Sequence, residues 1–82
     1  MAMLAVSVIS PEKVLFEGEA SSLVAPAHDG EVGILPQHAP FMALLGNGEL
    51  RLGGGERFLV RGGFLQVADD RVRIVTEWAE RS

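Results

Sequence analysis

The sequence predicts an all-β fold, a sandwich or flattened barrel of two antiparallel sheets with roughly eight to ten short strands. Apolar and polar residues alternate with period two over much of the 82 residues, which is the pattern of half-buried strands. Turn-forming clusters of glycine, proline, asparagine and aspartate interrupt the alternation at short intervals. No segment before residue 76 has a helical period, so we predict one domain spanning 1–82.

The first strand is predicted at 4–9, where Leu4, Val6 and Val8 fall on one face and Ser10-Pro11 ends the alternation. Later strands are expected in the apolar runs between successive turn signals, at 14–16, 21–25, 31–35, 41–45, 49–52, 56–60, 64–67 and 71–75.

Three positions are expected to end or bend a strand. Gly18 is expected to interrupt the second strand. Pro26 is expected to stop the third, because proline cannot donate a hydrogen bond to a central ladder. Gly62-Gly63 lies inside what would otherwise be one long strand, which indicates a corner where the chain passes between the sheets.

The tail at 76–82 is the exception to the β pattern, because Glu77, Ala79 and Glu80 favour helix over strand. One or two helical turns are too short to be stable alone. We therefore expect the tail to lead toward a helical region that the sequence does not contain.

Composition excludes several classes of partner. The net charge is −4, which argues against affinity for nucleic acid phosphates. Basic residues are scattered and Lys13 is the only lysine, so a polybasic contact with lipid is not expected. The chain has no cysteine and its first residues do not resemble a signal peptide, which favours the cytoplasm.

No constellation of residues predicts catalysis. The carboxylates occur in close pairs, which are typical of solvent-exposed strand positions or of turns. The pairs are Glu17/Glu19, Asp29/Glu31, Asp69/Asp70 and Glu77/Glu80. His28 and His38 match no compact metal-ligand spacing. The glycine clusters are not followed by Lys and Ser/Thr, so they predict turns and not a phosphate loop. We expect no catalytic, cofactor-binding or metal-binding residues.

One connection is unusually stiff. Pro36 follows the run Gly33-Ile34-Leu35, and Pro40 confines Ala39 to extended geometry. The backbone between them therefore has few conformations available. Either the segment presents a fixed shape, or the prolines only terminate the neighbouring strands.

The order of these motifs resembles the β-domain of the epsilon subunit of bacterial F-type ATP synthase, the equivalent of the mitochondrial delta subunit. The resemblance runs from about residue 5 to the end through these segments: VISPE at 8–12, FEGE at 16–19, DGEVGILPQHAP at 29–40, NGE at 47–49 and GGFLQV at 62–67. Members of this family usually have glycine where Gln37 stands.

The resemblance implies a non-catalytic rotor subunit of the central stalk that couples proton or sodium translocation to ATP synthesis. Its partners would be the gamma subunit and the c-ring, at the cytoplasmic face of the bacterial plasma membrane. By position, the c-ring contacts would be His28, Asp29 and Glu31, and the gamma contacts would be Ser10, His38, Pro40 and Met42. The C-terminal helical hairpin of many bacterial members is absent. The resemblance therefore implies neither inhibition of ATP hydrolysis nor nucleotide binding for this sequence.

Two alternatives remain open from the residues. A free-standing sandwich that binds a peptide or small ligand would have an apolar cavity between its sheets. A small hydrolase would bring His38 within hydrogen-bond reach of Asp29 or Glu31.

Overall fold

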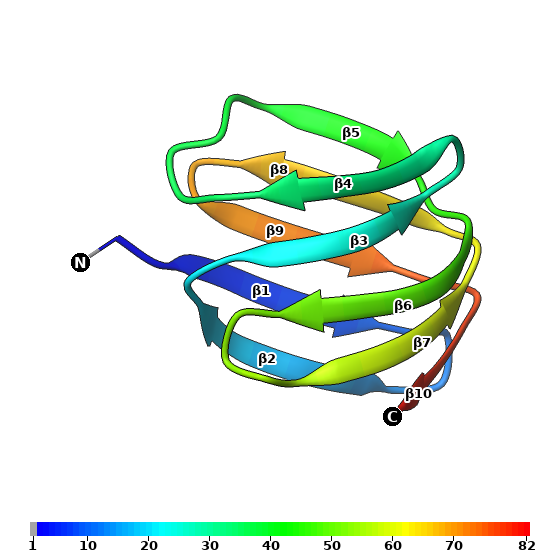
Figure 1. Cartoon of the computed structure of the whole chain (residues 1–82). Coiled ribbons are helices and arrows are strands. Elements are labelled where there is room, and N and C mark those ends of the chain that lie inside the picture. Colours follow the sequence, from blue (N-terminus) through cyan, green and yellow to red (C-terminus); the bar gives the residue numbers. More distant parts are fainter. Residues whose placement is uncertain (1) are drawn as a thin grey trace.

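The computed structural model describes residues 2–82, and these residues form ten strands in two five-stranded sheets (Figure 1). The strands are β1 (Leu4–Ile9), β2 (Val14–Ala20), β3 (Leu23–Ala27), β4 (Gly30–Ile34), β5 (Phe41–Leu44), β6 (Asn47–Leu52), β7 (Arg57–Arg61), β8 (Phe64–Ala68), β9 (Arg71–Val75) and β10 (Trp78–Arg81). The predicted sandwich is confirmed, and the sheets do not close into a barrel.

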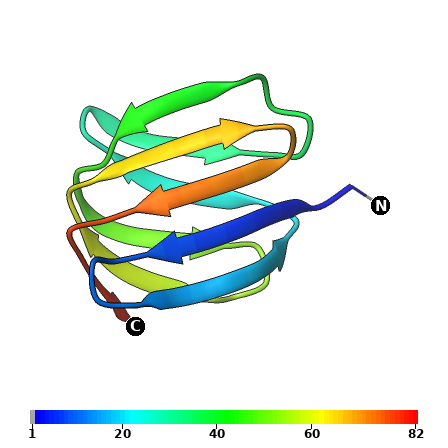
Figure 2. The ribbon, with the colours of Figure 1, turned by 180° about the vertical axis from the view of Figure 1, so that it is seen from behind.

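We call the two layers sheet A, with strand order β2-β1-β9-β8-β5, and sheet B, with order β10-β7-β6-β3-β4. Figure 2 shows sheet A from outside, with β5 uppermost and β2 lowest. Neighbours are antiparallel except β1 and β9, which run parallel from the pair Ala5–Arg71 to the pair Ile9–Val75. Sheet A is therefore mixed, where the sequence predicted only antiparallel pairing.

The alternating residues fill the space between the sheets. Leu4, Val6 and Val8, which were predicted to share one face, are buried, and Phe58 of β7 is the largest fully buried side chain. The ring of Phe16 meets that of Phe58 edge to face, with centroids 5.9 Å apart, a favourable aromatic geometry. Every buried polar side-chain atom within 2–82 has a hydrogen-bond partner. The interior is thus a packed core.

Two of the expected strand ends are wrong. Gly18 lies inside β2, opposite Val6. A β-carbon there would lie 3.1 Å from the Phe16 ring, so glycine leaves room for that ring within the strand. Pro26 lies inside β3, opposite Glu31. The ladder between β3 and β6 covers only Leu23 and Val24, so a residue without an N–H is tolerated beyond them.

The expectation of a helical tail is also wrong, because residues 78–81 form β10 along the edge of β7. The exposed backbone of an edge strand is a ready template for one more strand. The Thr76 Oγ1 lies 2.9–3.1 Å from the carbonyl oxygens of Arg61, Gly62 and Trp78. This buried hydroxyl fixes the turn that brings β10 back to β7.

The predicted corner at Gly62-Gly63 is confirmed. Both glycines have positive φ, 65° and 103°, and they join β7 of sheet B to β8 of sheet A. Within 2–82, no helix is long and apolar enough to cross a lipid bilayer.

Candidate interaction surfaces

The β3–β4 hairpin carries the residues predicted to contact the c-ring. His28 and Asp29 form its exposed two-residue turn, and the His28 N–H donates to the Leu44 carbonyl at 2.8 Å. Glu31 lies further along β4 and pairs with Arg51 across sheet B at 3.2 Å. The three residues are near one another, but Glu31 is partly neutralised and Asp29 forms no ion pair among the described residues.

Two carboxylates that sequence reasoning did not assign lie at the same end of the sandwich. Glu12 is in the β1–β2 connection, and Glu77 is in the β9–β10 connection; both connections lie at the right-hand end in Figure 1, with the β3–β4 turn. Lys13 and Arg61 share this end. Only the strand directions place these separate connections together, so no local sequence signal could identify the group.

The residues predicted to contact gamma are spread around the border of sheet A. Ser10 follows β1 at the end that also carries Asp29, whereas His38 and Pro40 lie in the β4–β5 connection at the opposite end (Figure 1). Met42 lies in β5, an edge strand of sheet A, and its side chain is exposed. The structure therefore does not gather these four residues into one cluster.

The stiff β4–β5 connection is tied to sheet A. Gln37 has a φ of 70°, a left-handed conformation that glycine adopts more easily, so the turn has the shape that a glycine there would favour. Its N–H donates to the Asp70 carboxylate at 2.5 Å. The His38 Nδ1 lies 2.7 Å from the Ala39 carbonyl oxygen, and its ring packs edge to face on Phe41. These contacts indicate a connection of fixed shape.

Replacing Asp70 with glycine is expected to loosen this connection while preserving the β8–β9 turn. Asp69 and Asp70 both have positive φ, 51° and 59°, so glycine suits either position. Only Asp70 accepts the Gln37 N–H, and a hydrogen bond to a charged group contributes about 1.5–3 kcal/mol. Amide hydrogen exchange at Gln37 should accelerate by about tenfold or more in Asp70→Gly.

Asp69→Gly is the matched control, because it alters the same turn without removing the acceptor. Asp70→Asn retains an acceptor oxygen and should restore much of the protection. Equal exchange at Gln37 in Asp70→Gly and the wild type would refute the role given to Asp70.

The geometry required by a hydrolase is absent from the described residues. His38 lies at the opposite end of the sandwich from Asp29 (Figure 1), and neither histidine forms an ion pair with a carboxylate. No group of three His, Cys, Asp or Glu side chains in 2–82 could hold a metal ion.

Comparison with known proteins identifies the family. Residues 3–82 match the β-sandwich domain of the ATP synthase delta/epsilon chain. The chain belongs to this family. It is 52% identical over 77 residues to the ATP synthase epsilon chain of Leptospira borgpetersenii, a match that covers 90% of this chain and 61% of the relative. It is 44% identical over 78 residues to that of Desulforamulus reducens, covering 92% and 59%.

Two solved structures contain chains with the same fold. A chain in the Euglena gracilis mitochondrial ATP synthase assembly of OSCP, F1 and c-ring superposes with a TM-score of 0.89 at 22% identity, covering 99% of this chain and 54% of that chain. A chain in the Tetrahymena thermophila mitochondrial central stalk and c-ring assembly gives 0.79 at 19% identity, covering 94% and 65%. Our chain spans about three fifths of the length of the curated relatives described above, 61% and 59%.

Proposed function

We propose that this domain is a non-catalytic part of the central stalk of a rotary F-type ATP synthase, which couples proton or sodium translocation to ATP synthesis. The observation that carries the proposal is the match of residues 3–82 to the delta/epsilon β-sandwich. A filled core and the separation of His38 from Asp29 favour a mechanical role over ligand binding or hydrolysis.

In this role the domain links the gamma subunit to the c-ring. We place it at the cytoplasmic face of the bacterial plasma membrane, as a peripheral part of the F1 sector that contacts lipid only through the complex. No cofactor or metal is required. A packed sandwich suits the task because a close-packed interior is barely compressible and transmits strain from one surface to another.

We assign the ring contact to the hairpin residues His28, Asp29 and Glu31. They occupy an exposed tip at the same end as Glu12 and Glu77, which suits a partner with basic loops. Rim charges of this kind set register and association rate more than affinity. Ser10, His38, Pro40 and Met42 are assigned to gamma, and they border sheet A.

Reversing the hairpin charges with Asp29→Lys and Glu31→Lys is expected to weaken docking on the c-ring and to spare gamma binding. Exposed ion pairs contribute about 0.2–1 kcal/mol each, so two reversals should reduce retention on purified c-ring by about tenfold at low salt. The measurement is cosedimentation of the subunit with c-ring in liposomes, together with gamma capture, at low and raised ionic strength.

The matched control is Glu56→Lys with Glu80→Lys, which makes the same change in net charge away from the hairpin. Unchanged retention and proton coupling in the Asp29/Glu31 variant would refute the assignment of the ring contact. Failure of the wild-type subunit to associate with either gamma or c-ring would refute the proposed function itself.

A further inference from the structure

Two sites in the chain place an aspartate or an asparagine directly before a glycine, Asp29-Gly30 and Asn47-Gly48. In such a pair the glycine nitrogen can attack the side-chain carbonyl carbon of the preceding residue and close a succinimide ring. Glycine favours this attack because it has no side chain beside its nitrogen. The two sites share this chemistry, so the fold decides which of them reacts.

The first site is exposed and unhindered. Asp29 and Gly30 both lie at the surface of the β3–β4 turn. A β-carbon added to Gly30 would meet no atom within 4 Å outside its chain neighbours, so no other group occupies the space in which the ring would form. The Asp29 carboxylate takes part in no ion pair and in no side-chain hydrogen bond within residues 2–82. It is therefore free to turn toward the Gly30 nitrogen.

The backbone at this site can open without disturbing the rest of the sheet. Gly30 is the first residue of β4, an edge strand that pairs only with β3. Its pairing with Ala27 is the last pair of that ladder before the turn. Ring closure requires rotation of the main chain between Asp29 and Gly30, and this rotation displaces only the terminal pair. Local openings of this kind have the lowest free energies within a protein, close to those of fraying ends.

The second site is held inside sheet B. Asn47 is exposed, but Gly48 pairs with Val60 in β6, which lies between β7 and β3. A β-carbon at Gly48 would lie 2.9 Å from the Pro26 β-carbon, so the proline side chain covers this part of β6. Rotation before Gly48 would have to separate β6 from β7 and displace Pro26. The fold therefore protects the asparagine site and leaves the aspartate site open.

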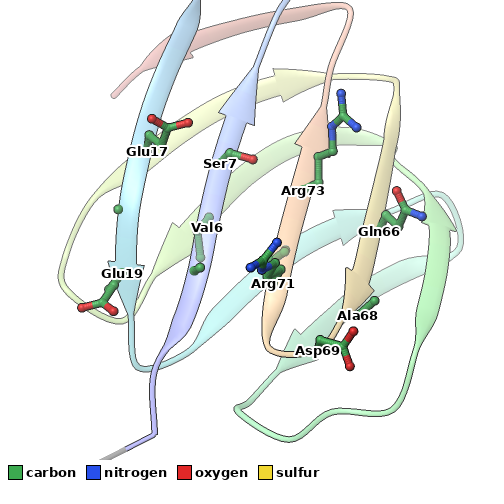
Figure 3. A pocket seen from close by; sticks show the side chains of 12 residues that line it. Val6, Ser7, Glu17, Glu19, Gln66, Ala68, Asp69, Arg71 and Arg73 are labelled. Atoms are coloured by element: carbon green, nitrogen blue, oxygen red, sulfur yellow. The ribbon is translucent and has the colours of Figure 1, made fainter.

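An exposed aspartate in another hairpin turn provides an internal comparison. Asp69 lies in the turn between β8 and β9, at the edge of a pocket on the outer face of sheet A (Figure 3). The next residue is Asp70, whose side chain hinders attack by its own nitrogen and whose carboxylate accepts the Gln37 N–H. The two turns thus differ in the residue that carries the attacking nitrogen.

We propose that Asp29 is a site of spontaneous aspartyl isomerisation. The Gly30 nitrogen attacks Cγ of the protonated Asp29 side chain. A C–N bond forms, the C–O bond breaks, and the hydroxyl group leaves with the amide hydrogen as water. Water then adds to one of the two ring carbonyls. Opening at Cγ restores aspartate, whereas opening at the main-chain carbonyl gives isoaspartate. The only co-reactant is water, and no group is oxidised or reduced.

Isomerisation changes the shape of the turn and keeps its charge. The main chain then runs through the Asp29 Cβ and Cγ and is one atom longer, while the former main-chain carbonyl becomes the free carboxylate. Because a two-residue turn fixes the register of its hairpin, the added atom should displace the pairing of Ala27 with Gly30. If the hairpin contacts the c-ring, the contact is reshaped without a change in charge. This consequence rests on the proposed function, whereas the isomerisation does not.

The test incubates the full chain in warm neutral buffer made with heavy-oxygen water and locates the products by peptide mass spectrometry with electron-transfer fragmentation. Each passage through the ring at Asp29 incorporates one heavy oxygen atom. The rate at Asp29 in the folded chain should lie within about tenfold of the rate in urea. Deamidation of Asn47 should be at least about a hundredfold slower in the folded chain than in urea. Asp69 should incorporate no measurable heavy oxygen.

Asp29→Glu is the matched variant, because it keeps the charge but requires closure of a larger ring. Incorporation at this position should fall by at least about tenfold. Asp69→Glu makes the same change in the other turn and should leave incorporation at Asp29 unchanged. Circular dichroism establishes that both variants are folded.

Protection of Asp29 as strong as that of Asn47, or equal incorporation at Asp29 and Asp69, would overturn the proposal whatever the domain binds. The consequence for binding has a separate readout. The isoaspartate form, separated by ion-exchange chromatography, should be retained at least about threefold less on c-ring liposomes than the fresh chain. Equal retention would refute this consequence alone. Failure of the fresh chain to bind the c-ring would instead count against the proposed function and leave the modification site in place.

Discussion

Gly63→Ala is expected to lower the free energy of unfolding by on the order of 4 kcal/mol, enough to leave a large unfolded population. A β-carbon at this position would lie only 2.0 Å from the Val75 carbonyl oxygen and 2.6 Å from the Thr76 α-carbon. Both are backbone atoms, at the end of β9 and just beyond it, so neither can move aside without displacing the chain there. Urea unfolding followed by circular dichroism measures the loss.

The reason for this cost is the way the corner joins the two sheets. Gly63 joins β7 to β8, and its carbonyl oxygen accepts the Leu45 N–H at 2.9 Å. Any shift that relieves the clash therefore disturbs sheet A, sheet B and the β5–β6 connection together.

Gly55→Ala separates the clash from backbone strain. Gly55 has a φ of 105°, close to the 103° of Gly63, but a β-carbon there would meet nothing within 4 Å. This variant should lose only the strain of a positive φ, about 1–2 kcal/mol. Equal losses in the two variants would show that the close approach at Gly63 has no energetic effect.

Phe58→Ala is the second large effect, with an expected loss of about 3–5 kcal/mol. The Phe58 side chain is 0% exposed and touches elements on several sides. It meets Phe16 of sheet A edge to face, and the Arg81 guanidinium lies 5.1 Å from its ring centre. Alanine would leave a cavity between the sheets and weaken the packing of β10 against the core.

This loss is a large share of the total free energy of unfolding, because small domains are only marginally stable, at about 0.05–0.15 kcal/mol per residue. Chemical denaturation should show a lower midpoint without a change in slope. Leu59→Ala is the control, since Leu59 is the next residue but points out of sheet B and is 39% exposed. Similar losses in the Phe58 and Leu59 variants would contradict the assignment of Phe58 to the core and of Leu59 to the outer face of sheet B.

These two variants bear on function as well as stability. Under the proposed function, the domain must keep its two outer surfaces in a fixed relation. The Phe58 and Gly63 variants should therefore weaken binding to both proposed partners, whereas the Asp29/Glu31 variant should weaken binding to the c-ring alone.

Local sequence was sufficient for most strands and for the corner between sheets. Alternation placed Leu4, Val6 and Val8 on one face because side chains in a strand alternate between faces, and the structure buries that face. Gly62-Gly63 was identifiable because two adjacent glycines inside an apolar run allow positive φ. The resemblance at 29–40 located the exposed hairpin and the stiff connection, although it could not show that Asp70 holds Gln37.

Other features required the folded chain. Glu77, Ala79 and Glu80 favour a helix locally, yet residues 78–81 become β10 because the unpaired edge of β7 is available to them. Pro26 remains in β3 because the neighbouring ladder ends before it reaches the proline.

The sequence by itself therefore determined the all-β class, the core positions and the family to which the chain belongs, since each of these depends on local alternation and motif order. Only the tertiary structure decided the parallel pairing of β1 with β9, the formation of β10 and which residues lie together on the outer face of sheet A. That face joins Val14 to Leu44 and Glu17 to Arg73 across strands. Such neighbours are set by pairing between distant segments. This pairing depends on backbone hydrogen bonds that every residue except proline can both donate and accept, so it leaves no local signal.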